Sequence, residues 1–282
     1  MYNQYPPMCF FALPSFCPNP MPISTASRVQ QFSQEEFGKV AYEVIGHAFD
    51  VHDSLGKKFH ESVYKGTMQQ ILGPRSVAEF AITLSHGSFV KNLYVDLLVE
   101  ASCPFELKSV TKLSDTHVSQ LIQYLMLLDL RHGKLINFGA EKVEHQFVNC
   151  HETTLQRQQF VVEYNNWIAS PETTTFEQTI TALVKDWGTG LSRSLYEEAC
   201  VHFFGGKERC EHFVETYWNE KTTGRQPMKL IEEGIAFEIT CKRNDLATYA
   251  SHLHKLIKNS DLKSILWANI VSGTVRFERI RS

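Results

Sequence analysis

The sequence predicts an α/β protein in which a small mixed sheet, covered by helices, is followed by a second unit of the same kind. Helix-like segments carry apolar residues at helical spacing, and the strand-like segments between them are short and apolar. Their order is helix, helix, three strands, helix, two strands, which is typical of an α/β sandwich. The second half of the chain then repeats the first at a constant offset.

Length and composition limit the number of domains and the kinds of function that the chain can have. The 282 residues are enough for one large domain or two of ordinary size. With 43% hydrophobic residues, 21% charged residues and a formal net charge of −3, the chain has no strongly basic coat. Any nucleic-acid binding therefore depends on local basic patches. No apolar run reaches the ~18 residues that a membrane span needs, so no membrane partner is expected. Composition leaves the oligomeric state open.

The cysteines indicate neither a zinc site nor a disulfide framework, because no two are spaced as C-x-x-C. Their scatter favours a reducing, cytoplasmic location. The seven are Cys9, Cys17, Cys103, Cys150, Cys200, Cys210 and Cys241.

The first 32 residues are predicted to form a disordered tail. They are rich in proline and polar residues and show no periodicity. The apolar stretch from Met8 to Leu13 follows no basic segment and is interrupted by prolines, so it does not look like a signal peptide. A second interpretation is that Met21 is the true start of the chain.

The first helix is predicted to begin after Ser33. Ser33 and Glu36 have the spacing of a capping box, and Gly56 ends the helical pattern. A second helix is predicted from about residue 59 to Leu72, because Gly73 and Pro74 follow directly. The apolar face of the first helix consists of Phe37, Val40, Ala41, Val44, Ile45, Ala48 and Val51.

Three strands, a helix and two more strands complete the predicted first unit. Glycine and serine mark the first turn, at Gly87-Ser88, and Ala101-Ser102 forms the second. The segments are strands 77–84, 89–100 and 103–109, a helix capped by Ser114 or Asp115 that carries Val118, Leu121, Ile122, Leu125 and Leu128, and strands 135–138 and 143–148.

Two acids and a lysine interrupt these apolar strands. Asp96 lies in the second strand, and Glu106 and Lys108 share one face of the third, because side chains in a strand repeat every two residues. An antiparallel pair would place Asp96 beside Glu106. Two carboxylates in an apolar setting repel each other unless a cation lies between them, and oxygen ligands of this kind suit Mg²⁺ or Mn²⁺. Taken alone, Glu-x-Lys on a strand is more often a solvated ion pair.

Several separated motifs together resemble a known family. Asp96 followed by Glu106-Leu107-Lys108, the phrase Phe59-His60-Glu61-Ser62-Val63-Tyr64, and Leu135-Ile136-Asn137-Phe138-Gly139 look like the GxxExxY proteins of the PD-(D/E)xK nuclease superfamily. The resemblance covers about residues 37–150. One departure is that Lys58 stands where the family has its first glycine, although Gly56 is close by. The resemblance implies a restriction-endonuclease-like αβββαβ core with a small mixed sheet.

The resemblance also implies roles for individual residues. Asp96 and Glu106 would bind Mg²⁺ or Mn²⁺ with the backbone carbonyl of Leu107, and Glu61 would complete the metal shell directly or through water. Lys108 would hold or activate the attacking water and stabilise charge on the phosphate. Gln120 and Tyr124 resemble the Q-x-x-x-Y pair of RecB-type nucleases, and their i, i+4 spacing places them on one helical face.

Past residue 150 the sequence repeats itself at an offset of 132. The offset relates Gly56 to Gly188, Tyr64 to Tyr196 and Glu106 to Glu238. The predicted organisation is therefore a tail at 1–32, a nuclease-like domain at 33–150, a linker at 151–169 and a degenerate repeat at 170–282. Further identities are Ser62 with Ser194, Gly73 with Gly205, Leu98 with Leu230, Phe105 with Phe237, Leu121 with Leu253, Asp129 with Asp261, and Asn137 with Asn269.

The repeat lacks the candidate site. A lone carboxylate, Glu238, cannot hold Mg²⁺ against water, so the second half is interpreted as a pseudonuclease that binds no catalytic metal. Its expected role is to pack on the first domain or to extend a nucleic-acid track through Lys229, Arg243, Lys255 and Lys263. The offset relates Glu61 to Arg193, Asp96 to Met228, Lys108 to Thr240, Gln120 to His252 and Tyr124 to Leu256.

The sequence thus favours a metal-dependent phosphodiesterase that acts on DNA in preference to RNA, with one live site in the first domain. The alternative is an inactive nucleic-acid-binding or scaffold protein with a nuclease-like fold. The intact residue set of the first copy favours the enzyme. The acidic balance and the degraded second copy favour the alternative.

Overall fold

A computed structural model describes residues 21–281 of the 282-residue chain. It is an α/β protein with two mixed six-stranded sheets, which confirms the predicted fold class and is consistent with a tandem nuclease-like core. Residues 1–20 of the tail predicted at 1–32, with Cys9 and Cys17, lie outside the described residues. No helix of the described part is long and apolar enough to cross a membrane.

The first unit follows the predicted order of elements. The capping box at Ser33 and Glu36 is present, and Gly56 ends the first helix with a positive φ of 70°. Its elements are β1 (Ile23–Thr25), α1 (Gln34–Leu55), α2 (Glu61–Leu72), the 3₁₀ turn η1 (Gly73–Arg75), β2 (Ser76–His86), β3 (Phe89–Val99), β4 (Cys103–Lys108), α3 (Asp115–Leu128), β5 (His132–Asn137) and β6 (Glu144–Asn149).

The second unit uses a similar series of elements. They are α4 (Thr154–Arg157), β7 (Val161–Asn165), α5 (Pro171–Trp187), α6 (Arg193–Phe203), α7 (Lys207–Cys210), β8 (Glu211–Trp218), β9 (Lys221–Glu232), β10 (Ile235–Thr240), α8 (Leu246–Lys258), β11 (Ser264–Val271) and β12 (Thr274–Arg281).

The two sheets share a five-stranded core. The first has the order β1-β2-β3-β4-β5-β6 and the second β7-β12-β11-β10-β9-β8, so β2 to β6 match β8 to β12. In both, the third and fourth core strands, β4 with β5 and β10 with β11, are parallel, and the other core pairs are antiparallel. Glu106 pairs with Leu135 in the first unit, and Glu238 pairs with Trp267 in the second. Adding 132 to each member of the first pair gives the second.

Two tertiary hydrogen bonds also recur at the same offset. The Tyr64 hydroxyl donates to the Gly56 carbonyl at 2.5 Å, and the Tyr196 hydroxyl donates to the Gly188 carbonyl, also at 2.5 Å. Each bond joins a helix to the glycine that ends the preceding helix. The Asn137 amide likewise bonds both backbone groups of Val110, as Asn269 bonds those of Lys242. Shared registers and shared bonds are stronger support for a repeat than residue identity alone.

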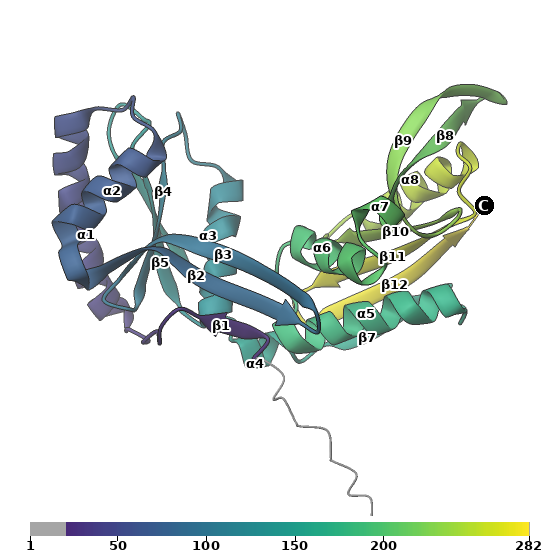
Figure 1. Ribbon diagram of the computed structural model, residues 1–282, viewed down its shortest axis with the longest axis horizontal. Coiled ribbons are helices and arrows are strands. Elements are labelled where there is room, and N and C mark those ends of the chain that lie inside the picture. Colours follow the sequence, from purple (N-terminus) through teal and green to yellow (C-terminus); the bar gives the residue numbers. More distant parts are fainter. Residues whose placement is uncertain (1–20, 282) are drawn as a thin grey trace, which may run out of the picture.

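The helices divide between the two faces of the first sheet. Figure 1 shows α1 and α2 on the outer face and α3 on the face turned toward the second unit. The α1–α2 side forms a core of its own with Leu97, Phe105 and Leu107. The α3 side belongs to a larger core that continues into α5 and α6, where Trp187 donates its indole N–H to the Ser85 carbonyl at 2.9 Å. The two units therefore share one hydrophobic core.

Two predicted boundaries differ from the structure. Within the predicted tail, Ile23–Thr25 pairs antiparallel with β2, because the edge of β2 offers free backbone groups. Within the predicted linker 151–169, α4 and β7 form, and β7 extends the second sheet parallel to β12. These segments are too short to show periodicity, so the sequence pattern did not reveal them.

Candidate active site

The candidate site lies on the α3 side of the first sheet, where β3 and β4 separate. The last paired residues are Leu97 and Phe105. Beyond this pair, the Leu107 N–H donates to a side chain of β3 and not to its backbone. The acceptor is Asp96 Oδ2, at 2.9 Å. Asp96 and Glu106 are thus brought to the same level of neighbouring strands, as the alternation of strand residues predicted.

Lys108 lies between the carboxylates. Its Nζ is 2.7 Å from Glu106 Oε1, 3.7 Å from Asp96 Oδ2 and 3.8 Å from Glu61 Oε2. All three acids therefore face one ammonium group, which supplies the cation that two neighbouring carboxylates require. Glu61 reaches the group from the first turn of α2, after His60 caps the helix by accepting the Ser62 N–H.

Burial shifts the pKa values of the charged groups in the site. Glu106 is only 1% exposed, and burial, with the nearby charge of Asp96, raises the pKa of its carboxyl to about 8. Burial similarly raises the pKa of Glu61, against the opposing effect of Lys108. For Lys108, burial alone would lower the pKa, but the attraction of Glu106 and the other acids outweighs it and raises the pKa. One oxygen, Glu106 Oε2, is buried without a hydrogen-bond partner.

Gln120 and Tyr124 lie on α3 and contact each other. The Gln120 side-chain amide donates to the Tyr124 hydroxyl at 3.1 Å, as their i, i+4 spacing allows. Tyr124 is 6% exposed, and burial raises its pKa to about 12, with smaller contributions from the charges of Glu106 and Asp96. The Tyr124 hydroxyl is therefore neutral and lies near enough to Glu106 and Asp96 for their charges to affect its pKa.

Two further charged residues belong to this cluster and were missed in the sequence. Lys65 donates to Asp96 Oδ1 at 3.0 Å and also pairs with Glu79 of β2. Two signals were present: Lys65 lies one helical turn after Glu61, and Glu79 is the only charge in the apolar strand β2. Neither signal is specific, because both patterns are common on solvated surfaces.

The residues present fit a divalent cation in part. The orphaned Glu106 Oε2, the Asp96 carboxylate and the Leu107 carbonyl form an all-oxygen set of the kind Mg²⁺ and Mn²⁺ prefer. The Leu107 carbonyl faces the same strand edge as its own N–H, toward Asp96. Within residues 21–281, however, no three His, Cys, Asp or Glu side chains converge as a metal-binding group. Lys108 lies among Asp96, Glu106 and Glu61, 2.7 to 3.8 Å from their nearest oxygens, so its ammonium group would lie beside any cation that this set holds.

The most exposed of the three acids around Lys108 is Glu61, whose side chain is 32% exposed. A surface depression of about 480 Å³ there is lined by Lys57, Lys58, His60, Glu61 and Ser109. Two lysines at its rim give a local positive charge that the overall composition does not show. Lys57 pairs with Glu141, so that part of this charge is already neutralised.

The equivalent position of the second unit contains a different set of contacts. Glu238 accepts the Tyr249 hydroxyl at 2.8 Å and lies 3.4 Å from Arg193, which takes the place of Glu61. Lys229, expected to supply free positive charge, lies 2.9 Å from Glu197. A cavity of about 650 Å³ opens here, bordered by Met228 where the first unit has Asp96. Glu238 is thus paired with one cation of the protein, Arg193, and accepts one hydrogen bond from Tyr249.

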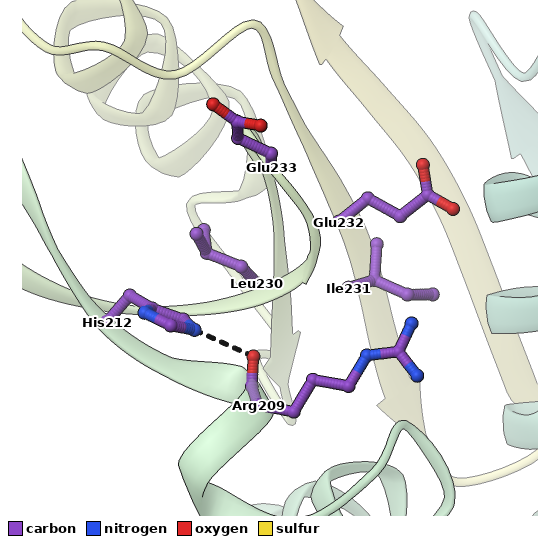
Figure 2. Close-up of a pocket in the computed structure, with 6 residues that line it drawn as sticks. All are labelled: Arg209, His212, Leu230, Ile231, Glu232 and Glu233. Atoms are coloured by element: carbon purple, nitrogen blue, oxygen red, sulfur yellow. Dashed lines mark hydrogen bonds between the residues drawn. The ribbon is translucent and has the colours of Figure 1, made fainter.

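A separate depression of about 430 Å³ lies beside the β8–β9 hairpin. Figure 2 shows Glu232 and Glu233 pointing away from each other, while His212 bonds the Arg209 carbonyl at 2.8 Å. Because its charged groups do not converge on one point, this depression lacks the geometry of a catalytic site.

Comparison with known proteins finds a family match for the first unit. Residues 38–150 match a family model described as the PD-(D/E)XK nuclease superfamily. The match includes Glu61, Asp96, Glu106, Lys108, Gln120 and Tyr124, and it ends before the second unit. No curated protein matches the chain.

Proposed function

We propose, on the premise that residues 38–150 are a PD-(D/E)XK nuclease superfamily domain, that this protein is a metal-dependent phosphodiesterase that cleaves nucleic acid. DNA is favoured over RNA by the resemblance to the GxxExxY branch. The observation that carries the proposal is the buried grouping of Asp96, Glu106 and Lys108, with one carboxylate oxygen of Glu106 unpartnered. Burial of charged groups costs folding free energy, and groups of this kind cluster at functional sites.

Different residues of the site would bind the metal ion and stabilise the charge that develops during hydrolysis. Asp96, Glu106, the Leu107 carbonyl and Glu61 would hold the Mg²⁺ or Mn²⁺ ion. When bound, such an ion lowers the pKa of its water and neutralises charge on the phosphate. Lys108, already 2.7 Å from Glu106, supplies a fixed positive charge at the place where negative charge grows.

The remaining candidates position groups around this centre. The Tyr124 hydroxyl, oriented by Gln120, offers a neutral hydrogen-bond donor on the face opposite α2. Burial keeps this hydroxyl protonated at neutral pH, because its pKa is raised to about 12. Lys57 and Lys58, at the rim of the depression beside Glu61, contact the phosphates of the approaching strand.

The second unit is proposed to be a degenerate copy that supports the first. Its register and its tyrosine-to-glycine bond match those of the first unit at an offset of 132. Arg193 supplies a positive charge to Glu238 and Tyr249 donates a hydrogen bond to it, so this carboxylate is compensated by the protein's own groups. It packs against the sheet face that carries the site and holds α3 in place, since the Ser192 N–H donates to the Gln123 side chain at 3.0 Å.

A second candidate is a nucleic-acid-binding protein that does not cleave. It is favoured by one observation, the occupation of the site centre by Lys108 in place of a converged acid cluster. The two functions differ in a single measurable property, which is product formation in the presence of metal.

The test is to incubate the purified chain with labelled single- and double-stranded DNA and RNA, with Mg²⁺, Mn²⁺ or chelator. We expect cleavage that needs metal and that falls at least about a hundredfold in Asp96→Asn and Glu106→Gln. The matched control is Glu238→Gln, which alters the equivalent glutamate of the second unit and should leave cleavage unchanged. Equal cleavage by the wild type and both site variants would refute the proposal. Binding without cleavage under every condition would establish the second candidate.

A further inference from the structure

Glu79 holds an unusual position in β2. Its neighbours Ala78 and Phe80 pair with Leu97 and Val95 of β3, which leaves Glu79 opposite Asp96. Its φ is 50°, a left-handed conformation that a residue with a side chain adopts only at a cost of about 1 kcal/mol or more. Residues held in such uncommon backbone conformations cluster at active sites.

The redirected carboxylate is joined to the candidate site by one lysine. Lys65 pairs with Glu79 and at the same time donates to Asp96 Oδ1 at 3.0 Å. Its side chain is 15% exposed, whereas that of Glu79 is 54% exposed. The lysine is therefore shared between a buried carboxylate inside the site and an open carboxylate at its edge.

Both oxygens of Asp96 are consequently occupied. Oδ1 accepts the Lys65 ammonium group, and Oδ2 accepts the Leu107 N–H. Each oxygen can accept a second bond, but the positive charge of Lys65 on Oδ1 repels a divalent cation that approaches the same oxygen. Withdrawal of a partly buried ammonium group is costly unless another acceptor is within reach, and Glu79 is such an acceptor.

We propose that Lys65 is a built-in counterion that competes with the divalent cation for Asp96, and that Glu79 takes Lys65 over when the cation binds. Lys65 and Glu79 are in this view positioning residues that set the affinity of the site for metal. The inference rests on the proposed function, because it concerns the same metal site.

The second unit provides an internal contrast. The 132-residue offset relates Lys65 to Glu197 and Glu79 to Glu211. The lysine has been replaced by an acid exactly one repeat later, and Glu197 there pairs with Lys229 at 2.9 Å. The second unit therefore lacks the shared lysine, and Glu211 lies opposite Lys229 of β9 and not opposite Met228, the residue that the offset relates to Asp96.

The experiment measures Mn²⁺ affinity by calorimetry in the full chain, in parallel with cleavage. Removal of the competitor in Lys65→Met should tighten Mn²⁺ binding about tenfold, because a positive charge beside Asp96 is lost. Removal of the acceptor in Glu79→Gln should weaken binding about threefold to tenfold, because Lys65 then stays on Asp96. In the double variant the competitor is absent, so affinity should stay above that of the wild type. Lys39→Met, which makes the same charge change at an exposed pair with Glu35, is the control and should leave affinity unchanged.

Three other results would contradict the competition by Lys65, the acceptor role of Glu79 or the proposed function. Weaker Mn²⁺ binding by Lys65→Met would show that Lys65 prepares Asp96 for the metal and would overturn the competition. A loss of a hundredfold or more in Glu79→Gln, or a double variant at or below wild-type affinity, would identify Glu79 as a direct ligand and overturn its role as acceptor. A wild-type protein that binds no Mn²⁺ would overturn the proposed function, and the inference with it, whereas the first two results leave the proposed function standing.

Discussion

The Lys108 ammonium group lies 2.7 Å from Glu106 Oε1, in a position where both side chains are almost inaccessible to water. The two residues share one face of β4 and are the only charged residues of that strand. Because β4 is central and covered on both faces, neither group can turn away into solvent. The charges of Glu106 and Lys108 therefore have to be compensated by each other and by nearby groups. As a result, the free energy of unfolding depends on whether Glu106 is protonated.

The first prediction is a pH dependence of stability that originates in Glu106. Its pKa is about 8 in the folded protein against 4.5 for an ordinary glutamate, so the folded state binds more protons than the unfolded state between these values. The contribution of Glu106 is fully present below pH 4.5 and is lost as pH rises through 8. In chelator, urea unfolding should show Glu106→Gln gaining stability relative to the wild type across this window. If the free energies of unfolding of the wild type and of Glu106→Gln changed in parallel with pH, this prediction would be wrong.

The second prediction concerns the Tyr124 hydroxyl. Tyr124→Phe removes the acceptor of the Gln120 amide but keeps the ring in the core, so the free energy of unfolding should fall by no more than about 1 kcal/mol. Cleavage should fall roughly tenfold, as expected for the loss of one hydrogen bond near the reacting groups. Tyr94→Phe, at an exposed position of β3, is the matched control. Unchanged cleavage by Tyr124→Phe would remove Tyr124 from the site.

The third prediction concerns Gly139, which closes the motif after β5. A Cβ added there would lie 2.4 Å from the backbone nitrogen of Val110, and backbone cannot move aside as a side-chain tip can. Gly139→Ala should therefore destabilise the protein by about 2 kcal/mol or more and displace the segment that follows Lys108. Gly38→Ala, in helix α1 where a Cβ meets nothing within 4 Å, should instead stabilise by up to about 1 kcal/mol. Thermal melts of both variants provide the measurement, and equal shifts would contradict the account.

The fourth prediction tests whether the second unit supports the first. Arg157 is 1% exposed and donates to the carbonyls of Met126 in α3 and Trp187 in α5, each at 2.8 Å. It thereby joins the ends of two helices from different units at the place where helix dipoles favour a cation.

Arg157→Met removes the donor of the Trp187 carbonyl and leaves the Met126 carbonyl only the longer bond from the Thr154 hydroxyl, so unfolding should become easier by roughly 2–4 kcal/mol. Because α3 also carries Gln120 and Tyr124, cleavage measured well below the melting temperature should fall as well. Lys185→Met, at the last turn of α5, is the control that removes a charge without the buried bonds. Lost stability with unchanged cleavage would confine Arg157 to a structural role.

The site illustrates where sequence reasoning succeeds. Asp96, Glu106 and Lys108 could be found because a charged residue in an apolar strand contradicts its surroundings, and period-two alternation fixes which face it occupies. Lys65 and Glu79 could not be assigned to the site in this way, although Glu79 is also an isolated charge in an apolar strand. Their significance depends on a left-handed residue in β2 and on the approach of α2 to β3, and neither is encoded in local spacing.

The sequence by itself determined the elements, their order, the chemical nature of the central residues and the 132-residue offset, because all of these follow from periodicity and residue type along the chain. Only the tertiary structure decided that Lys108 lies among three carboxylates, that Lys65 bridges Asp96 and Glu79, and that one hydrophobic core joins the two units. The short elements β1, α4 and β7 also depended on it. The physical reason is the same in each case: these features arise from contacts between residues far apart in the chain, whose partners become defined only when sheets and helices pack.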